Sequence, residues 1–207
     1  MDGRATAPAA GTILNALATG TGSAFAIDAE TTASVDLDAA GEVVGEVADA
    51  PDADTALVER CVDLAVAEHA DAEALDALGV DDPAAVGGAV RTDSEIPMAA
   101  GLKSSSAAAN ATVLATLDAL GVAEETDRED ACRLGVRAAR DAGVTVTGAF
   151  DDASASMLGG VTVTDNRTDE LLAREAVSWD VLVWTPPEQA YSADADVARC
   201  ERVAPGA

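Results

Sequence analysis

The sequence is poor in positive charge, in aromatic residues and in histidine. Its 207 residues contain 12 lysine and arginine residues against 38 aspartate and glutamate residues, a formal net charge of −26. This charge disfavours non-specific binding to nucleic acid or to an anionic membrane, so we expect neither as a partner. Acidic residues occur along the whole chain and lysine occurs once, which is typical of a halophilic protein whose self-repulsion is screened by salt. Because 49% of the residues are apolar and lie in periodic runs, we expect a folded protein and not a disordered acidic chain.

Cysteine and histidine are too few to support several common kinds of catalytic site. Cys61, Cys132 and Cys200 are far apart and lack the spacing of metal ligands, so we expect reduced thiols packed in the core of a cytoplasmic protein. The single histidine, His69, is expected on the surface of a helix. Ser–His–Asp hydrolysis and zinc chemistry are therefore poorly supported. The chain also has no apolar run long enough to cross a membrane and no signal-peptide pattern at its start.

Hydrophobic periodicity and glycine punctuation predict a sheet-rich start followed mainly by helices. Residues 2–48 contain short runs of small and β-branched residues, which predict several strands joined by permissive turns such as residues 18–24. Strands are predicted at residues 24–29, 33–37, 43–47, 85–93, 161–164 and 181–184. Helices are predicted at residues 54–70, 72–78, 107–120, 126–141 and 193–203, and a capping-box pattern indicates Thr126 as the cap of the fourth.

The serine-rich stretch at residues 95–110 has the features of an anion-binding loop. Pro97 excludes helix from its first half, and Gly101 permits backbone conformations that are closed to other residues. Residues 107–120 contain no helix breaker, and we predict that Ser104 caps this helix. The free N–H groups and the positive dipole end of the first helical turn favour a phosphate group.

Lys103, the one lysine of the chain, stands at the start of this helix. A solvated lysine there would oppose the helix dipole, so we expect Lys103 to face an anion. The alternative is an ordinary serine-rich helix cap with an unrelated lysine beside it. The loop is not a Walker A motif, because Leu102 precedes the lysine and Pro97 stands where the other glycine of that motif would be.

Two adjacent acidic residues, Asp151 and Asp152, open a short predicted helix that closes at Gly159 and Gly160. Acidic residues are common in first helical turns, so capping explains one of them. A second carboxylate in this apolar context could take a proton from a hydroxyl nucleophile or hold a magnesium ion. Together with the anion-binding loop, these residue types predict phosphoryl transfer from a nucleotide, which depends mainly on positioning and charge neutralisation.

The loop resembles the phosphate-binding motif of the GHMP kinases, a family that includes galactokinase and the homoserine, mevalonate and phosphomevalonate kinases. The resemblance implies that ATP binds along Pro97, Met98, Ala99, Ala100, Gly101, Leu102, Lys103, Ser104, Ser105, Ser106 and Ala107. Lys103 stands where most of the family has its third glycine, and in this respect the sequence is similar to the archaeal shikimate kinase branch. Residues 15–28, 148–153 and 159–166 resemble the same branch, so the likeness covers nearly the whole chain.

This resemblance implies ATP-dependent phosphorylation of the 3-hydroxyl of shikimate, a step towards chorismate and the aromatic amino acids. It also implies that Ser105 helps to hold Mg²⁺ near the β- and γ-phosphates and that Lys103 neutralises charge on the transferring phosphoryl group. Asp152 lies seven residues before Gly159, the spacing of the catalytic aspartate in mevalonate kinase and galactokinase. Whether Asp152 or its neighbour Asp151 faces the substrate stays open, and the matching residue of homoserine kinase is an asparagine.

The carboxylate of shikimate needs a cation among its binding residues. Arg4, Arg137 and Arg140 are candidates on charge alone, and each is better explained as a surface ion-pair residue.

The resemblance further implies an α+β fold of two lobes. The N-terminal lobe, residues 1–150, would resemble domain 2 of ribosomal protein S5 and contain the ATP loop, and the C-terminal lobe would be ferredoxin-like. The third, glycine-rich motif of the family has no match before residue 207, so we expect residues 151–207 to be the start of an incomplete second lobe. Two alternatives stay open: a GHMP kinase for another small alcohol such as homoserine, and an inactive fragment. The sequence does not predict the oligomeric state.

Overall fold

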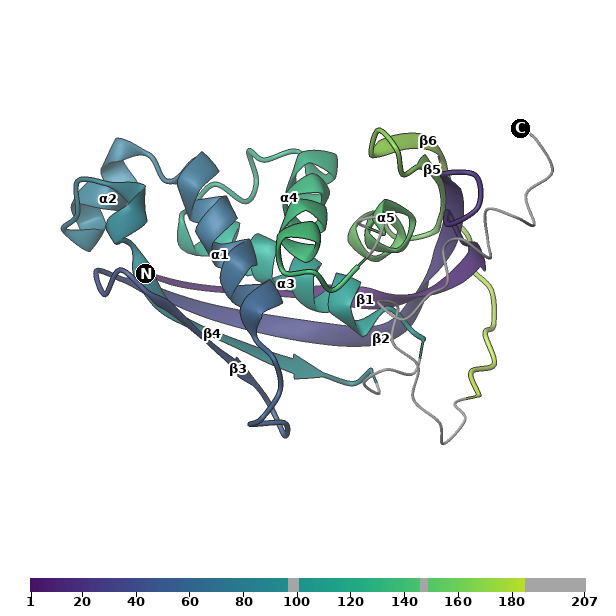
Figure 1. Cartoon of the computed structure of the whole chain (residues 1–207), viewed down its shortest axis with the longest axis horizontal. Helices are drawn as coiled ribbons and strands as arrows, with labels where there is room; N and C mark the ends of the chain where they lie inside the picture. The colour runs from purple at the N-terminus through teal and green to yellow at the C-terminus, as the bar shows by residue number, and fades with distance from the viewer. Residues whose placement is uncertain (97–100, 146–148, 185–207) are drawn as a thin grey trace.

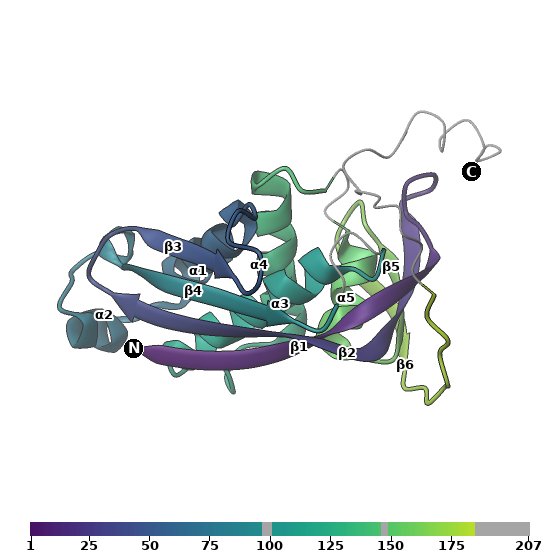
Figure 2. The same cartoon turned by 90° about the horizontal axis from the view of Figure 1, so that it is seen from below.

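Five α-helices lie on one face of a six-stranded sheet in the computed structural model of the chain, which describes residues 1–96, 101–145 and 149–184 (Figure 1). The strands are β1 (Asp2–Leu14), β2 (Thr21–Asp38), β3 (Val43–Val47), β4 (Gly87–Ser94), β5 (Val161–Asp165) and β6 (Glu170–Glu175). The helices are α1 (Ala56–His69), α2 (Ala72–Leu78), α3 (Ser104–Ala119), α4 (Arg128–Asp141) and α5 (Phe150–Leu158), with a short 3₁₀ turn at Pro83–Ala85. Figure 2 shows the same molecule from below, with the strands in front of the helices.

The long strand β2 is the centre of the sheet. Strand β1 runs antiparallel along one edge of β2, with Gly3 opposite Val35. The other edge is shared, because β4 pairs with residues 31–38 and β5 pairs with residues 21–25, both antiparallel. Strand β3 is parallel to β4, and β6 is antiparallel to β5. Through β2, the N-terminal part of the chain and the later β5–β6 hairpin belong to one sheet.

Helix α3 is the centre of the helical layer. It contacts β1 and β2 on one side and α1, α4 and α5 on the others. Most of its own residues are small or apolar and are buried, as expected for a helix that is covered on several sides. A Cβ atom at Gly3 of β1 would lie 2.1 Å from the carbonyl oxygen of Ala115, so only glycine allows α3 to come this close to the sheet.

The buried cysteines behave as small hydrophobic residues. Cys61 and Cys132 are free thiols and fully buried, and burial raises the pKa of both thiols far above the ordinary value. A thiol in this environment stays protonated and is a poor nucleophile, which confirms the packing role predicted for these two residues. Cys200 lies outside the described residues. Within the described part of the chain, no helix combines the length and the apolar composition that a membrane crossing needs.

The mixed α+β class and several of the predicted elements are confirmed. Helix α2 has the predicted bounds and ends at Gly79, which adopts a left-handed conformation. Helices α1 and α4 begin about two residues later than predicted, and α5 closes at Gly159 as expected. The division into two lobes at residue 150 stays a prediction.

The predicted strand pattern needs two corrections. Residues 24–29 and 33–37 belong to the single strand β2, because neither glycine nor proline interrupts the chain between them. The strand predicted at residues 181–184 is wrong, since these residues have no regular structure and Leu182 and Trp184 are exposed. Apolar residues favour a strand only where a neighbouring strand can pair with them, and no strand in the described ranges does so here. The helix predicted at residues 193–203 lies outside the described residues.

Two predicted helix caps are also wrong. Ser104 is the first residue of α3, because Lys103 occupies the N-cap position and its carbonyl oxygen already accepts from the N–H of Ala107. Helix α4 is capped by Asp127 and not by Thr126. The carboxylate of Asp127 accepts from two backbone N–H groups of the first turn, which places the cap one residue later than predicted.

Candidate active site

Three segments that are distant in the sequence meet at one carboxylate: the end of β1 and the starts of α3 and α5. The ammonium group of Lys103 lies 3.1 Å from Oδ2 of Asp152. The hydroxyl of Thr12 donates a hydrogen bond to Oδ1 of the same carboxylate at 3.1 Å. Lys103 therefore faces the carboxylate of Asp152 in this structure, and its predicted contact with a phosphate stays a prediction. Both carboxylate oxygens have a partner, so the side chain is held in one orientation.

The backbone around Lys103 places its side chain at this position. Lys103 has φ 60° and ψ 38°, a left-handed conformation that costs a residue with a Cβ atom roughly 1–2 kcal/mol. Gly101 is also left-handed, and the carbonyl oxygen of Leu102 accepts from the N–H of Ala10 in β1 at 3.3 Å. The end of the loop is thus tied to the sheet. Its earlier residues, Pro97 to Ala100, lie outside the described residues, so their predicted contact with ATP stays a prediction.

The environment of Asp152 makes its carboxyl group a weaker acid than usual. Burial, followed by the negative charge of Asp151, raises its pKa from 3.8 to about 6, although Lys103 and the hydroxyl of Thr12 act in the opposite direction. A carboxylate with this pKa is ionised at neutral pH and basic enough to take part in proton transfer. Strongly perturbed acids of this kind are concentrated at functional sites.

Asp151 is held on the other side of the helix start. Its carboxylate is buried and accepts from the side-chain amide of Asn166 at 2.8 Å. The carbonyl oxygen of that amide accepts from the backbone N–H of Asp151 at 3.1 Å. Strand β2 closes the space behind it, because a Cβ atom at Gly22 would lie 2.5 Å from both Cβ and Oδ2 of Asp151. The two adjacent aspartates, both buried, therefore have separate sets of partners.

The serines of the predicted phosphate loop border a cleft between α3, α4 and α5. Ser105 and Ser106 line it from the first turn of α3, and Thr145 and Ala149 line it from the segment that leads into α5. Ser105 itself is exposed. An incoming phosphate would meet hydroxyl groups and the N-terminal end of α3 at this place. A second groove lies between β2 and residues 177–183, and neither Lys103 nor the aspartate pair is among the lining residues of the groove or of the cleft.

The three arginines proposed for the substrate carboxylate are distributed over the surface. Arg137 forms an ion pair with Glu68, and Arg140 forms a double hydrogen bond with the carboxylate of Asp169 at 2.6 and 2.7 Å. These two are surface ion-pair residues, as the sequence favoured. Arg4 is exposed on β1.

Two residues of this site were missing from the sequence prediction. Thr12 is an ordinary hydroxyl at the end of a strand, and Asn166 is an ordinary asparagine at the end of another. Nothing in the local sequence shows that either one reaches the start of α5. The one available signal was that Asn166 ends a segment that resembles shikimate kinases.

Comparison with known proteins supports the class of protein that this fold and site define. A family model described as the N-terminal domain of GHMP kinases matches residues 56–160. A homoserine kinase structure from Cytophaga hutchinsonii has a TM-score of 0.59 at 16% identity, covering 83% of this chain and 51% of that one. The mevalonate kinase of Methanococcus jannaschii has a TM-score of 0.56 at 16% identity, covering 85% and 56%. The chain belongs to the GHMP kinases.

Within that family, the curated relatives that cover nearly the whole chain are shikimate kinases. The enzyme of Halobacterium salinarum is 68% identical over 98% of this chain and 67% of its own length. The enzymes of Methanothrix thermoacetophila (55%) and Methanosarcina mazei (49%) match 97% and 99% of this chain and 63% and 65% of their own lengths. The sequence is thus a member of the archaeal shikimate kinase branch, and it spans about two thirds of the length of these relatives.

Proposed function

We propose that ATP bound at the start of α3 transfers its γ-phosphoryl group to the 3-hydroxyl of shikimate, with Asp152 as the base. The observation that carries this proposal is the contact between Lys103 and Asp152. It joins the anion-binding end of one helix to a buried carboxylate on another at 3.1 Å. Phosphoryl transfer needs this combination of a site for the phosphate and an acceptor for the hydroxyl proton.

Asp152 would accept the proton of the attacking hydroxyl group. Its pKa of about 6 keeps the carboxylate ionised near neutral pH and closer in basicity to the working pH than an ordinary aspartate. Thr12 and Lys103 each hold one of its oxygens, which directs the carboxylate towards the start of α3. Asp151 faces Asn166 and Gly22, so we assign it no direct role in proton transfer.

Lys103 and the first turn of α3 would neutralise the charge of the phosphoryl group during transfer. Among the described residues, no three His, Cys, Asp or Glu side chains gather in the manner of a metal site. Mg²⁺ would therefore arrive with the nucleotide, as is common for this ion, and the exposed hydroxyl of Ser105 fits as its ligand from the chain. Bound in this way, Mg²⁺ supplies charge neutralisation at the β- and γ-phosphate oxygens.

We assign the biological setting from the relatives. The 68% identity to a Halobacterium enzyme and the acidic composition support work at high salt in the cytoplasm, on the route to chorismate and the aromatic amino acids. That residues 151–207 begin the second of two lobes is proposed from the family resemblance of the sequence alone. Small molecules, shikimate and ATP, are the proposed partners, and nucleic acid and membrane are not.

A panel of acceptor alcohols tests this function. ATP consumption would be measured at high salt with shikimate, homoserine, mevalonate and no acceptor, first with this 207-residue chain and then with a chain of the length of its relatives. We expect shikimate-dependent formation of ADP, with ³¹P NMR showing the phosphate on the 3-hydroxyl. Activity with another alcohol and none with shikimate in the longer chain would contradict the assignment.

A further inference from the structure

The first turn of α5 is capped from outside the helix. Its N-cap residue, Ala149, has a left-handed φ of 51° and no side chain that could cap. Asn166 takes over this function, because its Oδ1 accepts from the N–H of Asp151, the second residue of the helix. A cap normally accepts from the second or third residue of the helix, so this contact is an ordinary cap bond supplied from 15 residues away.

The amide of Asn166 can have one orientation only. Its Nδ2 donates to the carboxylate of Asp151 at 2.8 Å, while its Oδ1 accepts from the backbone N–H of Asp151 and from the hydroxyl of Thr164 at 2.7 Å. A flipped amide would set its donor against the backbone N–H of Asp151 and its acceptor against a carboxylate. The two groups of Asp151 therefore fix the direction of Asn166, the Thr164 hydroxyl adds a third hydrogen bond to it, and Asn166 holds Asp151 by both the backbone and the side chain.

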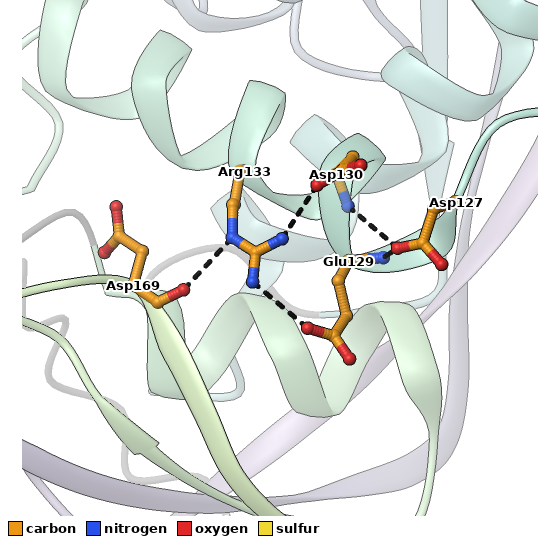
Figure 3. Close-up of polar contacts among 5 residues, drawn as sticks. All are labelled: Asp127, Glu129, Asp130, Arg133 and Asp169. Carbon is orange, nitrogen blue, oxygen red and sulfur yellow. Dashed lines mark hydrogen bonds and ion pairs between the residues drawn. The ribbon is translucent and has the colours of Figure 1, made fainter.

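The β5–β6 turn that carries Asn166 is itself anchored at two places. The N–H of Asn166 donates to the carbonyl oxygen of Gly20 at 2.8 Å. At the other end of the turn, Arg133 of α4 donates to the carbonyl oxygen of Asp169, as Figure 3 shows, and Arg140 binds its carboxylate. Arg133 is held in turn by Glu129 and Asp130 on its own helix (Figure 3). Asn166 is thus attached to a fixed frame and not to a free turn.

We infer that Asn166 is a positioning residue: by clamping Asp151 it sets the rotation of α5 that turns Asp152 towards Lys103 and Thr12. Consecutive residues of a helix point about 100° apart, so one of the two aspartates faces Lys103 only when the other faces elsewhere. The clamp on Asp151, with Gly22 behind it, selects Asp152. This inference rests on the proposed role of Asp152, but its test does not require turnover.

The test follows the Asp152 carboxyl group by ¹³C NMR during a pH titration of the 207-residue chain at high salt. Lys103 and Asp151 are the charged groups that act on this carboxyl, and its pKa in the wild type is expected at about 6. In Asn166→Ala the clamp is lost, the first turn becomes hydrated, and the pKa should fall by about one unit or more towards its ordinary value. Asp165→Asn, at the end of β5, is the matched control and should titrate like the wild type, because this half-buried side chain is bonded to Arg167 and not to Asp151.

A second pair of variants keeps the test decisive if Asn166→Ala does not fold. Thr164→Val removes the hydroxyl that holds Asn166 in place through a hydrogen bond to its Oδ1, and Thr164→Ser retains it. We expect a lowered Asp152 pKa in Thr164→Val and a value near that of the wild type in Thr164→Ser. In an active enzyme, Asn166→Ala should lower kcat by about 10- to 100-fold with KM for ATP changed by less than about 2-fold, because the phosphate site is separate.

The inference is overturned if folded Asn166→Ala titrates like the wild type, or if the two Thr164 variants behave alike. Failure of the proposed function would look different. In that case the acceptor panel would show no shikimate-dependent turnover, while the NMR titration would still report the clamp.

Discussion

The starts of α3 and α5 have similar backbone conformations but different surroundings. Each helix begins after a residue other than glycine in the left-handed conformation, Lys103 or Ala149, and neither of these side chains caps its helix. At α3 the first turn carries serines beside a cleft, so its N–H groups can receive a ligand. At α5 the first turn is closed by Asn166 and packed against Gly22. The start of α3 thus borders a cleft, and the start of α5 holds a buried carboxylate.

Two of the helices away from the site begin with a local side-chain cap. Asp71 caps α2 by accepting from Ala74, and Asp127 caps α4, in both cases from the N-cap position itself. Such local caps stabilise a helix by roughly 1 kcal/mol each. Both helices of the site lack such a cap, and so does α1, whose N-cap residue Thr55 makes no side-chain cap bond. A missing local cap therefore does not by itself mark a functional site.

The largest expected effect separates the two aspartates of α5. Asp152→Asn should lower shikimate-dependent turnover by about 10²- to 10⁴-fold, because it removes the proton acceptor. Asp151→Asn keeps a group of the same shape beside Asn166 and should lower turnover by less than about 10-fold. Steady-state kinetics of the two variants at one pH decide between them, and a greater loss in Asp151→Asn would reverse the assignment.

Substitution of Lys103 tests the proposed role of the start of α3. Lys103→Ala should lower kcat by about 10²- to 10³-fold through lost charge stabilisation. Since Lys103 lowers the pKa of Asp152, its removal should also move the acid limb of the pH–rate profile to higher pH. Lys103→Gly is the matched control for the backbone. It should lose the same activity but be more stable than Lys103→Ala by about 1 kcal/mol, since φ is 60°. A profile that does not move would contradict the contact.

A substitution at Gly22 tests the packing at the start of α5 through its effect on the stability of the fold. Gly22→Ala places a Cβ atom 2.5 Å from the Asp151 side chain and should lower the free energy of unfolding by about 1–3 kcal/mol, measured by denaturant titration. Combining it with Asp151→Gly removes the clashing side chain, so the two effects should not add. If the stability changes of the two substitutions add, the contact between residue 22 and Asp151 is not the cause of the destabilisation.

The smallest effect concerns pH. Because the pKa of Asp152 is raised from 3.8 to about 6, the folded state binds its proton more tightly than the unfolded state does. The free energy of unfolding should therefore fall as pH rises from 3.8 to about 6. The stability that this bound proton gives the folded state is fully present below that range and lost above it. Asp152→Asn removes this cost and should stabilise the fold at pH 8 by about 1–2 kcal/mol, with little change at pH 3.5. Equal stability changes at both pH values would be inconsistent with the raised pKa.

Prediction from the sequence agreed with the structure where the signal was local. Lys103 lies at the start of α3 and the aspartate pair lies at the start of α5, as predicted, while their functional roles stay predictions. Helices α2, α4 and α5 were predicted almost to their bounds because caps and glycine stops are also local.

It failed where a residue acts through tertiary contacts. Ser104 looks like a cap, but the left-handed turn at Lys103 starts the helix one residue earlier. Thr12 and Asn166 act on residues 140 and 15 positions away, and no spacing rule connects them. The strand predicted at residues 181–184 failed for the same kind of reason, since strand formation depends on a partner that the local sequence does not contain.

The proposal assigns ATP binding to the start of α3 and proton transfer to Asp152 at the start of α5. Measuring ATP binding and shikimate-dependent turnover in the same two variants tests it most directly. Isothermal titration with ATP and Mg²⁺ and an ADP-release assay would be applied to Lys103→Ala and Asp152→Asn. We expect Asp152→Asn to bind ATP within about 2-fold of the wild type and to turn over at least about 100-fold more slowly. Lys103→Ala should bind ATP at least about 10-fold more weakly. Normal ATP binding by Lys103→Ala, or loss of ATP binding in Asp152→Asn, would contradict the account.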